Sequence, residues 1–314
     1  MLVLDGGFGH LLKERGAGSF RAAALANIEQ PALVQELHSE YLRAGADCIT
    51  TNNFVAVPAV LDPISVPFTE AVAASARIAR EAVDSSGLAH ALVAGSLPPL
   101  GPTYDPAGAG TDPEALRETY KRIARELVPH CDVLLCETMS TLAEARAAAE
   151  AASAAGAPEI WVSFTLRDTY SDPRLRDGTP LATAAETLLS SRIPRVNGLL
   201  ANCCAPFAAD AAVPVLARSA ESCPVRVGAY ANGFRCTTDE WLAGGDEARP
   251  RATDPREYDA DGVVSVEAYS AHAREWRRAG ASVVGGCCGT SPAHTRALAE
   301  ALRGEGEVQA RTQR

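Results

Sequence analysis

The sequence predicts a single-domain α/β protein, a (β/α)8 TIM barrel, from three observations. The chain of 314 residues has a length common among α/β barrels. Short apolar segments of strand length alternate with longer amphipathic segments almost from end to end. Most strand candidates are continuous apolar runs, which is typical of a parallel sheet buried on both faces. A doubly wound sheet is the structural alternative, but no G-x-G-x-x-G follows the first strand to favour it.

Eight segments are predicted to form the strands of the barrel. In chain order they are residues 2–5, 48–54, 90–97, 132–138, 159–166, 197–204, 225–231 and 281–288. The intervening segments are predicted helices, of which 31–45 and 264–280 show the amphipathic pattern well. Pro31 suits a helix first turn, and Gly45 and Gly280 suit helix ends.

Two connections are longer than ordinary loops. Residues 98–113 follow the third strand and residues 233–262 follow the seventh. In a barrel both would lie over the C-terminal ends of the strands, where substrate loops gather. We expect the barrel to occupy residues 1–302, with 303–314 as a polar, disordered tail.

Composition restricts the class of partner. Twenty-nine lysine and arginine residues against 39 acidic residues give a net charge of −10, so nucleic acid and anionic membranes are not expected partners. No apolar stretch approaches the roughly 18 residues of a membrane span, and the apolar run at residues 1–4 is shorter than expected of a signal peptide. We therefore expect a cytoplasmic protein, monomeric or a small homo-oligomer, that acts on small molecules. Nine cysteines, an odd number, indicate free thiols or metal ligands rather than disulfides.

Polar side chains cluster where the predicted strands end. The C-terminal strand ends of a (β/α)8 barrel meet at one face, and this face carries the reactive groups. The residues that this rule selects are Asp5, Thr51, Asn52, Glu137, Asn202, Cys203, Cys204, Tyr230, Asn232, Cys287 and Cys288.

Two cysteine pairs end strands six and eight. One strand separates them, so their backbones would lie about 10 Å apart, close enough for sulfurs to share one zinc ion. The glycines around Cys287 and Cys288 would let the chain leave strand geometry and direct both thiols to the same side. From the other pair we predict Cys203 as the ligand, with Cys204 as packing or as a spare. A redox-active vicinal dithiol is the competing interpretation.

The other cysteines are predicted to be inert core or surface thiols. They are Cys48, Cys131, Cys136, Cys223 and Cys236. Three thiolates around Zn²⁺ would leave the centre at a charge of −1. Such a centre activates water poorly, but it holds an incoming thiol as thiolate, which suits alkyl transfer.

With these residues assembled, the chain resembles the homocysteine S-methyltransferase family, the zinc-dependent thiol methyltransferases, over about residues 2–302. Seven segments carry the resemblance: LDGGFGHLLKERG, AGADCITTNNF, DVLLCET, SFTLRDTYSDPRLRDGTPL, GLLANCCAP, VGAYAN and GGCCGTSPAH. The last segment is highly specific, and the ordered combination is stronger still.

The resemblance implies roles for individual positions. Cys203, Cys287 and Cys288 would bind zinc, and the substrate thiol would take the fourth site. Glu137 would bind the amino group of homocysteine. Asp5 and the backbone of Gly6 and Gly7 would help to anchor its amino-acid end, since glycine N–H groups can receive a carboxylate. Thr51, Asn202 and Asn232 are candidate pocket residues; Tyr230 suits core or site equally, and His10 is expected at the rim.

The implied reaction is direct methyl transfer to homocysteine, giving methionine. Departures from the family pattern concern the methyl donor: Phe8, Gly9 and His10 follow D-G-G, Asn53 replaces threonine or serine, and Ala231 precedes Asn232. A sulfonium donor, S-methylmethionine or S-adenosylmethionine, is the preferred interpretation. The alternatives are betaine as donor, another thiol or a selenol such as selenocysteine as acceptor, and a zinc- or redox-responsive barrel protein without turnover.

Overall fold

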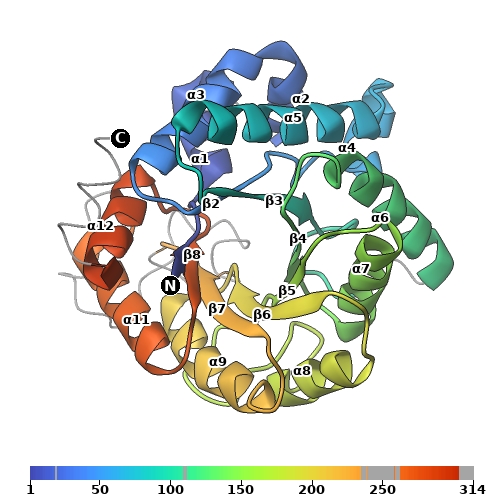
Figure 1. The fold of residues 1–314 in the computed structure, drawn as a ribbon. Helices are drawn as coiled ribbons and strands as arrows, with labels where there is room; N and C mark the ends of the chain where they lie inside the picture. Colours follow the sequence, from blue (N-terminus) through green and yellow to red (C-terminus); the bar gives the residue numbers. More distant parts are fainter. Residues whose placement is uncertain (18–19, 109–111, 235–237, 239–257, 259–261, 304–314) are drawn as a thin grey trace.

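The chain forms a ring of eight strands with its helices arranged around the outside (Figure 1). The structure is a computed structural model, and it describes residues 1–314 except 18–19, 109–111, 235–237, 239–257, 259–261 and 304–314. All seven strand ladders are parallel, in the order β1-β8-β7-β6-β5-β4-β3-β2. The predicted (β/α)8 barrel is confirmed.

Each strand overlaps one of the eight predicted segments. The strands are β1 (Leu2–Val3), β2 (Cys48–Thr50), β3 (Leu92–Leu97), β4 (Val133–Met139), β5 (Ile160–Phe164), β6 (Val196–Asn202), β7 (Arg226–Ala231) and β8 (Val283–Gly286).

The helices of the described residues form the outer layer of the barrel (Figure 1). They are α1 (Phe8–Leu12), a π-helical turn (Lys13–Ala17), α2 (Phe20–Glu29), α3 (Pro31–Arg43), α4 (Pro58–Leu61), a 3-10 turn (Asp62–Ile64), α5 (Phe68–Ser86), α6 (Pro113–Leu127), α7 (Leu142–Ala154), α8 (Leu181–Ser190), α9 (Pro206–Ser219), α11 (Val266–Arg278) and α12 (Pro292–Arg303). In the part of the chain that the structure describes, none of them combines the length and the apolar character of a membrane span.

The two helices with the clearest sequence pattern begin and end as their flanking residues predict. Pro31 is the first residue of α3, where its missing N–H has no cost. Ser265 precedes α11, and its side chain accepts a hydrogen bond from the Ala268 N–H at 3.2 Å. Gly45 and Gly280 follow the two helices with positive φ angles of 103° and 110°.

Large apolar side chains fill the barrel interior, so the barrel is closed below the functional face. One buried cluster takes members from all eight strand segments, including Leu4, Leu135, Trp161 and Leu200. Trp161 is the largest of them, and Gly198 on the neighbouring strand makes room for it. A Cβ atom at residue 198 would lie 2.5 Å from Cδ1 of the Trp161 indole, so only glycine fits there.

The barrel closes between β1 and β2 through a short seam rather than a full ladder. A single parallel bridge joins Leu4 to Cys48, and the Asp47 N–H donates to the Val3 carbonyl at 2.7 Å. The Asp47 carboxylate accepts the Val3 N–H at 2.8 Å and forms an ion pair with Arg303 at the end of α12. Both charged side chains are buried, at 4% and 5% exposure, so this pair ties the last helix to the seam.

Parts of the two long connections lie outside the described residues. The first is described over residues 98–108, and α6 begins at Pro113. Most of the second, residues 233–262, is also outside the described part of the chain. Of the expected tail, residues 303–314, Arg303 is the last residue of α12, and the remaining residues lie outside the described part.

We expect Arg303→Ala to destabilise the protein, because it leaves the buried Asp47 carboxylate without its guanidinium partner at the seam. Removing one member of a buried pair typically lowers the free energy of unfolding by about 3–5 kcal/mol. Arg77→Ala, which removes an exposed pair with Glu81, should change it by about 0.5 kcal/mol or less. Urea denaturation measures the free energy of unfolding of both variants. Equal decreases in the two variants would contradict a special role for the seam.

Candidate metal centre and substrate pocket

The structure brings three cysteine sulfurs together at the C-terminal end of the barrel. The Sγ atoms of Cys203, Cys287 and Cys288 all lie within 4.8 Å of one another. Cys203 Sγ is 2.9 Å from Cys287 Sγ and 3.9 Å from Cys288 Sγ. Cys203 follows β6 and the other two follow β8, as predicted from the sequence.

Backbone conformation decides which cysteine of the first pair joins this cluster. Along β6, Leu200 points into the barrel interior and Ala201 points into the core under the helices. Strict alternation would therefore direct Cys203 outward and Cys204 inward. Cys203 instead has a left-handed φ of 52°, which breaks the alternation. Its thiol turns to the three-cysteine cluster, while Cys204 packs in the helix-facing core.

The turn after β8 positions the other two thiols. The Thr290 N–H donates to the Cys287 carbonyl at 3.1 Å, which closes a four-residue turn over Cys287–Thr290. Gly289 takes a φ of 80° at its third position, where glycine is favoured. Gly286 remains in β8, and it is needed for space because a Cβ there would lie 2.1 Å from the Thr290 hydroxyl.

The glycines after β1 pack against this turn. The Gly7 N–H donates to the carbonyl and the hydroxyl of Thr290, at 3.0 and 3.2 Å. A Cβ at residue 7 would lie 2.8 Å from the Cys287 carbonyl oxygen. The Gly7 N–H is thus used within the protein, whereas the Gly6 N–H has no acceptor among the described residues.

Two buried carboxylates lie in the same end of the barrel. Asp5 accepts hydrogen bonds from the Thr50 N–H at 2.7 Å and from its hydroxyl at 3.0 Å. Glu137 accepts one from the Ser96 hydroxyl and one from the Tyr230 hydroxyl, the latter at 3.5 Å. Neither carboxylate forms an ion pair with a lysine, arginine or histidine among the described residues.

Burial controls the ionisation of both carboxyl groups. It raises the pKa of Asp5 from 3.8 to about 7 and the pKa of Glu137 from 4.5 to about 7. The negative charge of Glu137 raises the pKa of Asp5 further. Two desolvated carboxylates that repel each other form a site that favours a small cation, such as an ammonium group.

Thr51 supports this site indirectly. Its hydroxyl donates to Asn53 Oδ1 at 2.5 Å and accepts the Ser96 N–H at 2.9 Å. The Asn53 amide in turn donates to the Ser96 carbonyl at 2.9 Å. These bonds fix Ser96, whose own hydroxyl bonds Glu137. Asn52 belongs to a different contact, since its amide donates to Asn27 on α2 at 3.1 Å.

The two predicted asparagines differ in how their amides are used. The Asn202 amide forms hydrogen bonds across β5 to β4. Asn232 donates its backbone N–H to the Cys204 carbonyl at 2.8 Å and its side-chain NH₂ to Thr238 at 3.3 Å. The Asn232 Oδ1 atom is buried and has no hydrogen-bond partner among the described residues, so it remains a candidate for a substrate N–H.

Tyr104 is a site residue that the sequence argument missed. Its hydroxyl donates to Cys203 Sγ at 3.0 Å, and the Arg176 guanidinium lies 5.1 Å from the centre of its ring. Tyr104 belongs to the 98–113 connection, which was predicted to cover this face. The presence of an aromatic residue in that connection could have suggested a role at the site. The sequence does not indicate, however, which sulfur its hydroxyl would reach.

His10 lies beside the three-cysteine cluster but outside it. Its Nδ1 accepts the Gly289 N–H at 3.4 Å, and its ring centre is 5.5 Å from that of Phe234. Burial lowers the pKa of His10, which favours the neutral ring that this hydrogen bond needs. His10 therefore braces the turn that carries Cys287 and Cys288.

Most of the cysteines predicted to be inert are buried in apolar surroundings. Cys48 lies in the barrel interior, Cys131 and Cys136 lie in the helix-facing core, Cys223 is partly exposed, and Cys236 lies outside the described residues. Burial raises the pKa of Cys131 to about 12, so this thiol is protonated and unreactive at neutral pH.

The three clustered thiols have the donor set and spacing for a metal ion. Hydrogen bonds from Cys203 and Cys287 hold the pKa of Cys288 well below its usual range, and the hydrogen bond with Cys203 raises the pKa of Cys287. One thiolate thus makes further ionisation unfavourable unless a cation joins the cluster. Sulfurs on a tetrahedron around zinc lie about 3.8 Å apart. The Cys203–Cys288 spacing of 3.9 Å matches this value, while Cys203–Cys287 is shorter.

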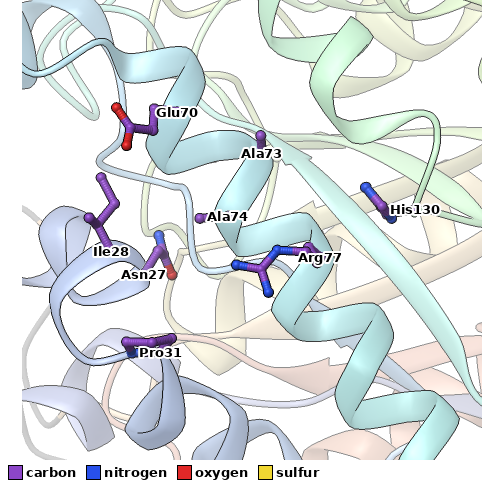
Figure 2. A pocket seen from close by; sticks show the side chains of 8 residues that line it. All are labelled: Asn27, Ile28, Pro31, Glu70, Ala73, Ala74, Arg77 and His130. Carbon is purple, nitrogen blue, oxygen red and sulfur yellow. The ribbon is translucent and has the colours of Figure 1, made fainter.

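A separate hollow lies on the outer helices (Figure 2). It is lined by Asn27, Ile28, Pro31, Glu70, Ala73, Ala74, Arg77 and His130. These residues come mainly from α2, α5 and the start of α3, not from the C-terminal strand ends. None of them takes part in the site described above.

The chain is similar to homocysteine S-methyltransferases along almost its whole length. Residues 2–302 match the family "Homocysteine S-methyltransferase". The Escherichia coli K12 homocysteine S-methyltransferase is 31% identical, over 95% of this chain and 94% of the relative. Homocysteine S-methyltransferase 4 of Zea mays is 30% identical, over 96% of this chain and 89% of the relative.

A solved structure shows the same similarity in three dimensions. The metallated form of the homocysteine methyltransferase MmuM from Escherichia coli superposes with a TM-score of 0.76 at 28% identity, and the match covers 95% of both chains. Together with the sequence matches, this shows that the chain belongs to the homocysteine S-methyltransferase family of enzymes.

Proposed function

We propose that this protein transfers a methyl group from a sulfonium donor to the thiol of L-homocysteine and requires zinc to do so. The observation that carries the proposal is the pairing of two sites at one end of the barrel. A three-cysteine cluster can hold a thiol-binding metal, and two buried carboxylates can hold an ammonium group. Homocysteine carries both groups.

The carboxylates would bind and orient the amino-acid end of homocysteine. Glu137 and Asp5 would receive the ammonium group, which supplies the positive charge that neither obtains from a described side chain. The Gly6 N–H is available to the substrate carboxylate, whereas the Gly7 N–H already bonds Thr290. Orientation of the amino-acid end limits the freedom of the thiol before reaction.

Cys203, Cys287 and Cys288 would hold the zinc ion. When bound there, Zn²⁺ would keep the homocysteine thiol in its thiolate form at neutral pH. The Tyr104 hydroxyl would keep its hydrogen bond to Cys203 and so withdraw negative charge from that ligand. The metallated form of the Escherichia coli relative supports a metal in this family.

The methyl group would move in a single displacement. The homocysteine thiolate forms the new sulfur–carbon bond as the donor sulfur keeps the electron pair of the bond that breaks, and the thiol proton passes to solvent. A sulfonium donor loses its charge in this step, so a pocket of low dielectric constant favours the reaction. Cys203 is buried, and Cys287 and Cys288 are only partly exposed, which would keep the dielectric constant around the cluster below that of water.

A donor panel tests the proposed reaction. The zinc-loaded protein is mixed with homocysteine that carries deuterium on its carbon chain and with unlabelled S-methylmethionine, S-adenosylmethionine or betaine, so that labelled methionine can arise only by methylation of homocysteine. We expect labelled methionine with at least one sulfonium donor and only background with betaine, as measured by mass spectrometry. Labelled methionine from betaine alone would contradict the proposed donor class, and no methionine from any donor would contradict the function.

We expect Cys287→Ala to abolish zinc binding and methionine formation, because it removes one of three metal ligands. Cys204→Ala is the matched control, since the neighbouring thiol of the other pair packs in the core. The control should retain a full zinc equivalent and most of the activity. Metal analysis gives the zinc content of both variants, and a methionine assay gives their activity. Loss of zinc in Cys204→Ala but not in Cys287→Ala would mean that Cys204, and not Cys287, is a zinc ligand.

We expect Glu137→Gln to weaken homocysteine binding and to stabilise the substrate-free protein above neutral pH. The folded protein holds a proton on Glu137 between pH 4.5 and about 7 that the unfolded chain releases. The free energy of unfolding therefore falls as pH rises through this window, by up to about 3 kcal/mol at this residue. Loss of a charge-assisted hydrogen bond should weaken homocysteine binding by about 10- to 100-fold.

Urea denaturation at pH 5 and pH 8, about two units below and one above neutrality, measures the stability change. Calorimetry at pH 8 measures homocysteine binding. The exposed Glu81→Gln should change neither quantity. If the Glu137→Gln protein had the pH dependence and the affinity of the unaltered protein, Glu137 would not be the ammonium site.

A further inference from the structure

The Asn202 side chain links three neighbouring strands at the functional end of the barrel. It is fully buried at the end of β6. Its Oδ1 accepts the Thr138 N–H at 2.9 Å and the Ser163 hydroxyl at 2.7 Å, and its NH₂ donates to the Thr138 hydroxyl at 2.9 Å. One amide therefore spans β5 and fixes the end of β4.

The residue that Asn202 holds has an unfavourable backbone conformation. Thr138 has a left-handed φ of 60°, which is rare for a β-branched residue and costs about 1–3 kcal/mol unless the surroundings impose it. The register between β4 and β5 shifts between Cys136 and Met139, so Thr138 lies in a β-bulge. Asn202 binds both the backbone N–H and the hydroxyl of Thr138, and so stabilises this conformation.

The bulge comes directly after Glu137. Leu135 points into the barrel interior, and strict alternation would return Met139 there as well. Met139 lies instead in the helix-facing core, so the change of direction occurs at Thr138. The backbone on the C-terminal side of Glu137 therefore depends on the bond between Thr138 and Asn202.

The other neighbour of Asn202 is Cys203, which also has a left-handed φ, of 52°. The Asn202 amide thus joins two parts of the proposed site. It binds Thr138, which follows Glu137, and Asn202 itself directly precedes Cys203. A ligand that binds both sites must match the spacing between the Glu137 carboxylate and the Cys203 sulfur. The affinity of a ligand that binds only through its thiol does not depend on this spacing.

We propose that Asn202 is a positioning residue that sets this spacing, and thereby selects acceptor thiols that carry an ammonium group at the reach of homocysteine. The inference rests on the proposed function, since it concerns the acceptor of that reaction. Homocysteine has two methylene groups between its thiol and its α-carbon, whereas cysteine has one. Asn202 would favour the longer amino acid without touching it.

The test compares homocysteine with 4-mercaptobutanoate, which has the same chain and thiol but no amino group. Calorimetry gives the dissociation constant of each thiol with zinc-loaded protein, metal analysis gives zinc content, and methyl transfer gives kcat/KM. The variants are Asn202→Leu and Asn202→Ser, neither of which can bond Thr138 across β5. Ser163→Ala is the matched control, because it removes one bond to the same Oδ1 atom and leaves both bonds to Thr138.

We expect the unaltered protein to prefer homocysteine, and both Asn202 variants to lose about 10- to 100-fold of this preference. Their zinc content and their affinity for 4-mercaptobutanoate should stay close to those of the unaltered protein. The discrimination between homocysteine and cysteine should fall with the preference. Ser163→Ala should keep the preference.

Two other results would overturn the inference. Equal losses of affinity for both thiols, or a loss of zinc in parallel, would mean that Asn202 only holds Cys203 in place. A preference unchanged in both Asn202 variants would mean that the spacing is set elsewhere. If Asn202→Leu did not fold, the smaller and polar Asn202→Ser would decide between these results. If the unaltered protein itself did not bind homocysteine, the proposed function would fail first, and this inference with it.

Discussion

The site depends on one backbone constraint: strand alternation must stop at the C-terminal end of the barrel. In a regular strand, neighbouring side chains point to opposite sides, so two adjacent groups cannot both face the barrel axis. Cys203 and Thr138 interrupt the alternation by left-handed φ angles, and Gly289 does so in the turn after β8. Each interruption either turns a functional side chain toward the barrel axis or turns a neighbouring side chain away from that axis. The polar groups that stabilise these conformations are thus as necessary to the site as the clustered cysteines.

The electrostatics of the site follow from the closed interior beneath it. Apolar side chains from all eight strand segments exclude water, so carboxyl groups at the upper end lose hydration. The resulting rise in pKa makes Asp5 and Glu137 unfavourable as free anions and favourable as partners of an ammonium group. The same surroundings make three adjacent thiolates unstable without a divalent cation. Burial thus lowers the stability of the ligand-free protein here, and it would strengthen the binding of a cation.

Hydrogen bonds between loops hold this arrangement at a fixed position above the barrel. Asp168, after β5, accepts the Ala205 N–H at 2.6 Å and the Thr238 N–H at 2.7 Å. Arg176 lies between Asp168 and Tyr104, so the connections after β3, β5, β6 and β7 form one network around Cys203. At the opposite end, the Asp47–Arg303 pair secures the seam at which the barrel closes. The site is therefore supported both by its own loops and by the closure of the ring.

The sequence by itself determined the barrel, its eight strands and most of the candidate residues at the functional end. Apolar runs report burial on both faces, and strand ends in a parallel barrel meet at one face, so Cys203 and Glu137 could be grouped before any coordinates. Tertiary structure decided the rest, because it depends on backbone angles and on contacts between distant segments. The left-handed φ of Cys203 placed this thiol, and not Cys204, in the cluster. Tyr104 reached the same sulfur from another loop, and no pattern within a single segment encodes that distance.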